Sequence, residues 1–224
     1  MNPQTAFLFD LDGTLVDSVY HHVLAWHEAL ASEGIELSIW RIHRKVGMSG
    51  GLFTNMLLRE TGLALEPDRV ERLQRLHAEA YIKRIDEIRP LPGAEALLEF
   101  LTQAGIPWAV ATSGRLETAG LALAKLDVAI GGAPIVTRDD VRFAKPDPDL
   151  FLAAAARLGI EISSAFVVGD SVWDMLAAQR ARALGIGVLS GGYGRDELER
   201  AGAYRVFQDP ADLLRHIDEL GARR

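Results

Sequence analysis

Two aspartates, Asp10 and Asp12, directly follow the apolar run Thr5–Phe9, and their spacing could bring both carboxylates into one reactive site. The run is short and β-prone, which predicts a buried strand. Side chains two residues apart in an extended backbone share a face, and open α/β sheets bind ligands at the carboxyl ends of their strands. Buried neighbouring carboxylates repel unless a cation neutralises them. A hard divalent ion such as Mg²⁺ takes oxygen ligands, so the pattern predicts a metal site, with a solvated acidic turn as the alternative.

Two further motifs could bind the oxygens of a phosphate group. The segment Ala111-Thr112-Ser113-Gly114 follows a predicted strand and offers a hydroxyl and exposed backbone N–H groups, which suit a phosphate oxygen. The same segment could be an ordinary turn. Lys145 precedes a proline turn that leads into a helix, so the direction of its ammonium group is restricted. A cation there would offset the carboxylates and the charge of a phosphate, whereas most lysines are simply solvated.

A second acidic motif follows the apolar strand predicted over Ala165–Gly169. Asp170 comes at the end of this strand, where its carboxylate could reach the same metal ion as Asp10. Asp174 follows in the first turn of the next predicted helix. A carboxylate in that position is also favoured by the helix dipole, so Asp174 has both a structural and a metal-binding interpretation.

The rest of the chain supplies the elements that must position these groups. Apolar runs alternate with segments of helical spacing after about residue 89, which predicts a parallel sheet with helices on both faces. The expected strands are Pro107–Thr112, Ile135–Val136, Ala165–Gly169, Ile186–Leu189 and Tyr204–Phe207. The expected helices are Ala94–Gln103, Glu117–Lys125, Pro148–Leu158, Val172–Ala183 and Pro210–Leu220.

The segment between residues 17 and 88 breaks this alternation. Helical spacing begins at Val19–Ala31 and strand-like runs are missing as far as about Glu87. We therefore predict a doubly wound, Rossmann-like α/β core formed by residues 1–16 and 89–224, with an all-helical cap inserted as residues 17–88.

Size and composition limit the classes of function. A chain of 224 residues with 49% hydrophobic residues can form a large α/β core and an insert. The formal net charge of −7 argues against a general nucleic-acid binder. No run approaches the roughly 18 apolar residues of a membrane span, and no signal peptide is visible. The absence of cysteine excludes disulfide scaffolds and Cys-based zinc sites or nucleophiles. We expect a soluble, cytoplasmic protein, a monomer or weak dimer, without nucleic-acid or membrane partners.

The ordered set of motifs resembles the haloacid dehalogenase-like hydrolase superfamily, which is mostly phosphatases. The set consists of Asp-Leu-Asp-Gly-Thr, Thr-Ser, Lys-Pro, and Gly-Asp with a trailing Asp, and it spans essentially the whole chain. The place and helical content of the insert resemble the cap of the branch that holds phosphoglycolate phosphatases and β-phosphoglucomutases, as does the stretch Val19–Trp26. This resemblance implies a Mg²⁺-dependent phosphatase acting on a small phosphorylated metabolite of the phosphoglycolate or sugar-phosphate class.

The resemblance also implies roles for the four aspartates. Asp10 would attack phosphorus and form an aspartyl-phosphate. Asp12 would protonate the leaving alcohol and then deprotonate the hydrolytic water. The Mg²⁺ ion would be held by the Asp10 carboxylate, the backbone carbonyl of Asp12 and Asp170, with Asp174 in support.

Other site residues follow from the same resemblance. Thr112 and Lys145 would hold the transferring oxygens, and Lys145 would also stabilise Asp10, while Ser113 and Gly114 would bind substrate. His22 falls where the mutase branch has a functional histidine, which makes it a candidate substrate contact, although it could be a surface residue of a cap helix. The remaining histidines are interpreted as surface residues: His21, His27, His43, His77 and His216.

Departures from the family pattern narrow the function. In the mutases a cap arginine grips the phosphate that is not transferred, whereas here Gly50 stands at that position, which disfavours a mutase. Asp12 is present, which disfavours dehalogenase chemistry. Lys45 lacks the context of the Schiff-base lysine of the phosphonate-cleaving relatives. A β-phosphoglucomutase-like phosphosugar mutase remains the enzyme alternative, and a regulatory module that accepts phosphate at Asp10 is the alternative of another class.

Overall fold

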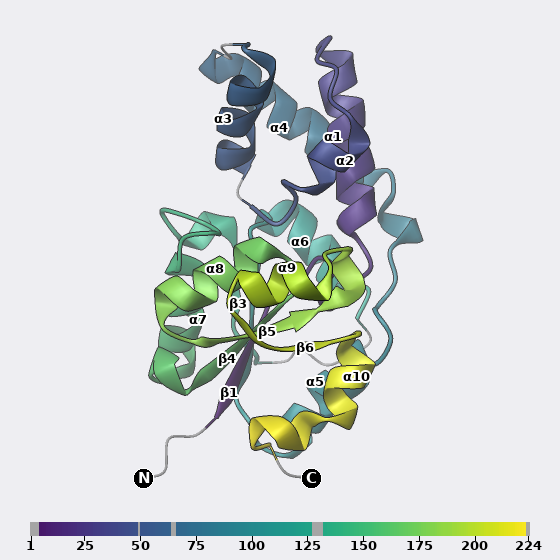
Figure 1. The fold of residues 1–224 in the computed structure, drawn as a ribbon. Helices are drawn as coiled ribbons and strands as arrows, with labels where there is room; N and C mark the ends of the chain where they lie inside the picture. The colour runs from purple at the N-terminus through teal and green to yellow at the C-terminus, as the bar shows by residue number, and fades with distance from the viewer. Residues whose placement is uncertain (1–4, 49, 64–65, 127–131, 223–224) are drawn as a thin grey trace.

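The computed structural model describes residues 5–48, 50–63, 66–126 and 132–222, and its centre is a six-stranded sheet (Figure 1). All neighbouring strands are parallel and the order is β3-β2-β1-β4-β5-β6. The strands are β1 Ala6–Phe9, β2 Trp108–Ala111, β3 Ile135–Val136, β4 Ala165–Gly169, β5 Leu184–Val188 and β6 Ala203–Phe207. The chain winds outward from β1 in both directions, which confirms the predicted doubly wound α/β fold.

Helices cover both faces of the sheet because successive side chains of each strand point to opposite sides. The helices are α5 Ala94–Gln103, α6 Leu116–Leu123, α7 Asp149–Leu158, α8 Val172–Ala181, α9 Arg195–Arg200 and α10 Pro210–Arg215. Phe7 and Phe9 of β1 belong to the hydrophobic cluster shared with α5, α6 and α10. Leu8 belongs to the cluster shared with α7 and α8.

The structure corrects several predicted boundaries. The helix α8 ends at Ala181 rather than Ala183, because Arg182 adopts a left-handed φ of 63° that ends the helix. β5 consequently begins at Leu184, two residues before the expected start. The short helix α9 was not predicted, because Leu198 is its one buried residue and its other side chains are charged.

Residues 19–82 form four helices that lie together beyond the carboxyl edge of the sheet (Figure 1). They are α1 Val19–Ser32, α2 Ile39–His43, α3 Gly50–Thr61 and α4 Pro67–Ile82. Their own hydrophobic cluster includes Trp26, Phe53 and Leu73, so the segment has a core separate from the two clusters of the sheet. We call these four helices the cap.

The chain enters and leaves the cap along two adjacent segments. The backbone N–H of Asp17 donates to the carbonyl of Arg89 at 2.9 Å, and the N–H of Leu91 donates to the carbonyl of Leu15 at 2.9 Å. These bonds join the two segments that connect the sheet to the cap. The position of the cap over the sheet is therefore set by two hydrogen-bonded connections rather than by one.

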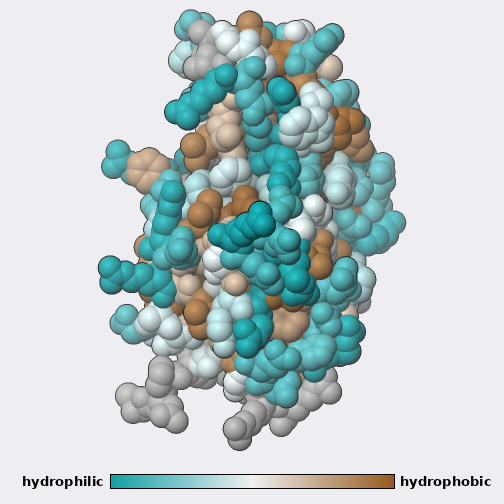
Figure 2. All heavy atoms as spheres, viewed as in Figure 1, coloured by the Kyte–Doolittle hydropathy of each residue, from teal (hydrophilic) through white to brown (hydrophobic). Residues whose placement is uncertain are grey.

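The surface in view carries interspersed polar and apolar residues, with the apolar ones in separate small patches (Figure 2). Within the part of the chain that the structure describes, no helix combines the length and apolar character needed to cross a bilayer.

Candidate active site

The first and fourth strands bring two aspartates together at the carboxyl edge of the sheet. β1 and β4 are neighbours with Phe9 opposite Val168, and the N–H of Asp10 donates to the carbonyl of Val168 at 2.8 Å. Asp10 and Asp170 each follow directly on their strand. Both side chains are therefore held side by side by the register of the sheet, and both are buried.

Three carboxylates and one ammonium group form the floor of the site. Asp10, Asp170 and Asp174 each offer an oxygen atom, and these atoms lie within 4.8 Å of one another. The ammonium group of Lys145 pairs with Asp10 and lies 2.8 Å from Oδ1 of Asp174. Lys145 is fully buried. One cation thus pairs with two of the three carboxylates, and the cluster carries an excess of negative charge when all three are ionised.

Burial and mutual repulsion change the acidity of these groups. Burial raises the pKa of Asp10 to about 7, with Asp174 and Asp12 adding to the rise and Lys145 opposing it. Burial and the charges of Asp174 and Asp10 also raise the pKa of Asp170 well above its ordinary value. Burial alone would lower the pKa of Lys145, but the two carboxylates beside it raise it instead. The lysine therefore stays charged, while the carboxylates need a further cation.

The donor set fits a hard divalent cation. Asp10, Asp170 and Asp174 all offer carboxylate oxygens, which Mg²⁺ prefers, and the excess negative charge is buried where water screens it little. The surrounding backbone leaves room for the carboxylates because residue 191 is a glycine. A Cβ atom at that position would lie 1.6 Å from Oδ2 of Asp170. Thr14 Oγ1 donates to Oδ1 of Asp170 at 3.3 Å and orients it.

Asp174 occupies the third position of α8 and is fixed there by the helix start. The N–H and Oγ–H of Ser171 donate to Oδ2 of Asp174 at 3.1 and 2.5 Å, and the N–H of Asp174 returns a bond to Ser171 Oγ at 3.4 Å. This is a capping box. A Cβ atom on Gly169 would lie 2.3 Å from the Asp174 side chain, so only glycine permits this approach.

The Asp12 carboxylate lies apart from the three-carboxylate cluster and faces the cap. Its Oδ1 accepts from Ser18 Oγ at 2.5 Å and is 3.2 Å from Nε2 of His22. Burial would raise the pKa of Asp12, but the interactions with His22 and Ser18 outweigh it and lower the pKa. Gly13, directly after Asp12, turns the chain with a φ of 80°. Asp10 and Asp12 line one cavity although their carboxylates have different partners.

The segment after β2 lines the same cavity. The N–H of Gly114 donates to Oγ1 of the buried Thr112 at 3.0 Å. Ser113 Oγ is buried and has no hydrogen-bond partner among the described residues. A hydroxyl in that state is suited to a ligand oxygen.

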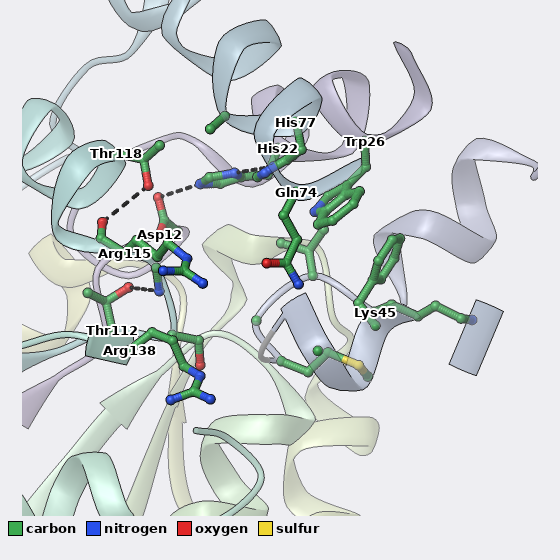
Figure 3. Close-up of a pocket in the computed structure, with 18 of the residues that line it drawn as sticks. Asp12, His22, Trp26, Lys45, Gln74, His77, Thr112, Arg115, Thr118 and Arg138 are labelled. Carbon is green, nitrogen blue, oxygen red and sulfur yellow. Dashed lines mark hydrogen bonds and ion pairs between the residues drawn. The ribbon is translucent and has the colours of Figure 1, made fainter. Parts of the chain in front are cut away.

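A cavity of about 200 Å³ lies between the core and the cap, with residues of both in its wall (Figure 3). The predicted residues Asp10, Asp12, Thr112 and His22 all line it, as do Ser113 and Gly114. The wall also includes residues that the sequence interpretation missed: Trp26, Gln74, His77, Arg115 and Arg138.

Two of these residues are arginines that follow the carboxyl ends of strands, and this position in the sequence could have identified them as site residues. Arg115 follows the segment after β2, and Arg138 lies two residues beyond β3, at the same edge of the sheet as Asp10. Arg138 Nη1 donates to the carbonyl of Val141 at 2.6 Å, and Arg115 lies 3.3 Å from Asp139. Their guanidinium groups supply positive charge at the core side of the cavity (Figure 3).

The cap contributes mainly neutral groups. Lys45 is buried, and its ammonium group contacts Glu60 at 2.5 Å and the carbonyl of Arg41 at 3.3 Å, so its charge is balanced within the cap. Two histidines that were expected at the surface lie elsewhere. His43 is buried with Nε2 2.8 Å from the carbonyl of Gly191, and His77 is half-buried in the wall of the cavity. Tertiary packing, which the sequence pattern does not show, decides both.

Comparisons with known proteins agree with this geometry. A family model described as haloacid dehalogenase-like hydrolase matches residues 4–182. Hexitol phosphatase A of Escherichia coli is 36% identical over 179 residues, with 78% of each chain covered. A phosphoglycolate phosphatase of Rhodospirillum rubrum is 34% identical over 221 residues, covering 93% of this chain and 88% of that protein.

Solved structures show the same fold along the whole chain. The crystal structure of a hydrolase from Pseudomonas syringae has a TM-score of 0.95 at 56% identity, covering 97% of this chain and 99% of that one. A putative β-phosphoglucomutase from Bacteroides vulgatus has a TM-score of 0.87 at 24% identity, covering 99% and 91% of the two chains, which shows a shared fold alone. The family model and the relatives above 30% identity together establish that the chain belongs to the haloacid dehalogenase-like hydrolases.

Proposed function

We propose that this hydrolase is a phosphatase that cleaves a small phosphorylated metabolite through an aspartyl-phosphate at Asp10. The observation that carries the proposal is the buried pairing of Asp10 with Lys145, together with the cavity that both Asp10 and Asp12 line. Its relatives of more than 30% identity are named as phosphatases. The enzyme class is therefore that of a phosphoric monoester hydrolase.

Asp10 acts as the nucleophile. Its carboxylate attacks phosphorus, the ester oxygen leaves, and the phosphoryl group becomes bonded to the Asp10 oxygen. Lys145 opposes the rise in the pKa of Asp10 that burial causes, and holds its carboxylate in place through their ion pair. Thr112, Ser113 and Gly114 bind the non-bridging oxygens of the phosphoryl group from the β2 side through hydroxyl and N–H groups.

Asp12 acts as the acid and then as the base. It gives a proton to the leaving alcohol in the first step and removes a proton from the attacking water in the second. That water attacks phosphorus, which releases inorganic phosphate and restores Asp10. His22 and Ser18 hold Oδ1 of Asp12 toward the cavity, and His22 also lies at the substrate side of the cap.

We also propose that Mg²⁺ binds to Asp10, Asp170 and the carbonyl oxygen of Asp12, with Asp174 supporting the site. When bound, the ion supplies charge that screens the carboxylates from an anionic substrate and aligns the phosphoryl group. Asp174 serves chiefly to orient Lys145, since its oxygens already contact Lys145 and Ser171.

The substrate is proposed to be a phosphorylated small molecule enclosed between residues 17–88, acting as the cap, and the catalytic core. A cavity of about 200 Å³ that mixes apolar and polar walls fits such a molecule. The relatives differ in the substrates their names state, including hexitol phosphates and phosphoglycolate. Closure of the cap over the substrate would exclude water and complete the site.

The test is a panel of phosphate esters, including 2-phosphoglycolate, hexitol phosphates and p-nitrophenyl phosphate, with inorganic phosphate measured in the presence of Mg²⁺. We expect turnover of at least one physiological ester that is lost on chelation and restored by Mg²⁺. Hydrolysis that continues unchanged in excess chelator would contradict the metal assignment. A protein that becomes phosphorylated once without turnover would instead support the regulatory module.

A further inference from the structure

A line of three side chains runs from Asp12 into the cap. His22 Nε2 lies 3.2 Å from Oδ1 of Asp12, and His22 Nδ1 lies 3.1 Å from Nε2 of His77. His22 is on α1 and His77 is on α4, 55 residues later in the chain. Figure 3 shows the three side chains in sequence across the upper wall of the cavity, joined by dashed lines.

Aromatic packing fixes the planes of the two imidazole rings. The His22 ring lies on Tyr81 with centroids 3.9 Å apart and planes 6° apart. The His77 ring lies on Trp26 with centroids 4.2 Å apart and planes 15° apart. Stacking holds each ring in its plane but does not distinguish the ring from its flipped form, so the hydrogen bonds must select the orientation.

The hydrogen-bonding capacity of each group constrains the protons along this line. While Asp12 is ionised its carboxylate only accepts, so His22 Nε2 then carries the hydrogen that it donates to Asp12. His22 Nδ1 is left to bond Nε2 of His77, and this bond selects the ring orientation that stacking leaves open. Burial and the neighbouring His22 lower the pKa of His77 well below its ordinary value, which keeps His77 neutral. A neutral His77 can accept or donate at Nε2 according to its tautomer.

We propose that His77 is a positioning residue for the acid–base step, acting through His22 to hold Asp12 at the leaving-group oxygen. The inference rests on the proposed phosphatase function and adds to it a residue from the far side of the cap. His77 is outside the cluster of Asp10, Asp170 and Asp174. Its bond to Nδ1 fixes the orientation of His22, and His22 fixes Oδ1 of Asp12. Because α1 and α4 must be packed correctly for this, the acid–base group is assembled only when the cap is intact.

The leaving group separates this role from a general structural one. An alkyl phosphate releases an alkoxide that needs a proton from Asp12, whereas p-nitrophenyl phosphate releases a stable phenolate that does not. A misplaced Asp12 therefore slows phosphoryl transfer from the alkyl ester and leaves the first turnover of the aryl ester unchanged. A general loss of structure slows both.

The test compares His77→Gln with His77→Asn. The amide nitrogen of glutamine can occupy the place of imidazole Nε2, whereas that of asparagine corresponds to Nδ1 and falls short of His22. His27→Gln is the matched control, since His27 is an exposed histidine of α1. Each variant is assayed for steady-state turnover of an alkyl phosphate and, by rapid mixing, for the first-turnover release of p-nitrophenolate.

We expect His77→Asn to lower kcat for the alkyl phosphate by about 10- to 100-fold, part of the ~10²–10⁴-fold that a positioned acid–base group contributes. KM and the p-nitrophenolate burst should stay unchanged, and His77→Gln should recover most of the loss. Long-range ¹H–¹⁵N spectra should show His22 protonated at Nε2 in the wild type and in His77→Gln, and a mixture of tautomers in His77→Asn.

Unchanged alkyl phosphate turnover in His77→Asn would overturn the inference, and so would a burst that falls in parallel with it. An unchanged His22 tautomer in that variant would also overturn it, without reference to activity. Failure of the proposed function looks different, because the wild-type protein itself would then hydrolyse neither ester.

Discussion

Lys145 is shared by two carboxylates, and the third is left without an ion pair. Lys145 contacts Asp10 and Asp174, whereas Asp170 has no ion-pair partner among the described residues and accepts one hydrogen bond from Thr14. The raised pKa of Asp170 has burial as its main cause. Asp170 is therefore the carboxylate that depends most on a metal ion, and Asp174 is the one that depends most on the protein.

Asp170→Asn and Asp174→Asn should consequently fail in different ways. Asp170→Asn should raise the Mg²⁺ concentration needed for half-maximal turnover by at least about tenfold, because it removes a ligand. It should leave the metal-free melting temperature close to that of the wild type. Asp174→Asn should lower that melting temperature, because it breaks the ion pair with Lys145 and weakens the capping box of α8, and should change the Mg²⁺ requirement less.

Magnesium titrations of turnover and thermal melts in chelator measure the two effects. Equal shifts of the Mg²⁺ requirement in the two variants would show that the ranking of the ligands is wrong.

At the scale of elements, the sequence predicts the strands and the edge where they end. Short apolar runs followed by Asp10, Thr112 and Asp170 specify both the sheet and the residues at its carboxyl edge, because position after a parallel strand is a local property. The helix start at Ser171 is local as well. Arg138 follows the same rule, since it lies two residues beyond the correctly predicted strand Ile135–Val136, but a lone arginine there carries no motif that distinguishes it from a surface residue.

The cap side of the site was less predictable because it depends on helix packing. His22 and His77 are 55 residues apart, and the pattern of each helix alone does not show that they meet. Only the packing of α1 on α4 decides it. The side chain of Asp12 likewise points to the cap because of the turn at Gly13 and the bond to Ser18, whereas the strand periodicity suggested one shared direction with Asp10.

The start of α3 tests the choice between phosphatase and mutase. This helix begins at Gly50, where a mutase would have a phosphate-gripping arginine, and Ser49 lies outside the described residues. Without that grip, water should reach the phosphorylated Asp10 faster than a second sugar hydroxyl. We expect β-glucose 1-phosphate with a trace of glucose 1,6-bisphosphate to give free phosphate and little glucose 6-phosphate.

The products are followed together by a coupled glucose 6-phosphate assay and a phosphate assay. Efficient formation of glucose 6-phosphate with little free phosphate would contradict the phosphatase proposal. Another cation at the cavity, such as Lys45 or Arg138, would then have to supply the grip.

At the scale of the whole molecule, the acidic cluster links stability to pH. The pKa of Asp10 is raised in the folded protein from 3.8 to about 7, and that of Asp170 is also raised. The metal-free folded state then binds more protons than the unfolded state between these values, so this contribution to stability falls as the pH rises through that window. Mg²⁺ binds the ionised carboxylates and reverses the loss.

The increase in melting temperature caused by Mg²⁺ should therefore be larger at about pH 8 than at about pH 5.5, where protons compete for the same oxygens. Differential scanning fluorimetry with and without Mg²⁺ at both pH values measures this increase. Asp170→Asn should reduce the Mg²⁺-induced increase in melting temperature at both pH values. A larger effect of Mg²⁺ at the lower pH would contradict the assignment of these carboxylates as the metal site.

The most direct test of the whole mechanism is to trap the phosphoryl group on Asp10. Wild-type protein is mixed with a phosphate ester and Mg²⁺, quenched in acid during turnover, reduced with borohydride and analysed by peptide mass spectrometry. Reduction converts an aspartyl-phosphate to homoserine, and we expect that change at position 10 only in the presence of substrate. Asp10→Asn should lack it and turn over at less than about a hundredth of the wild-type rate, while its circular dichroism stays native. Trapping at another residue, or turnover by Asp10→Asn above that level, would contradict Asp10 as the nucleophile.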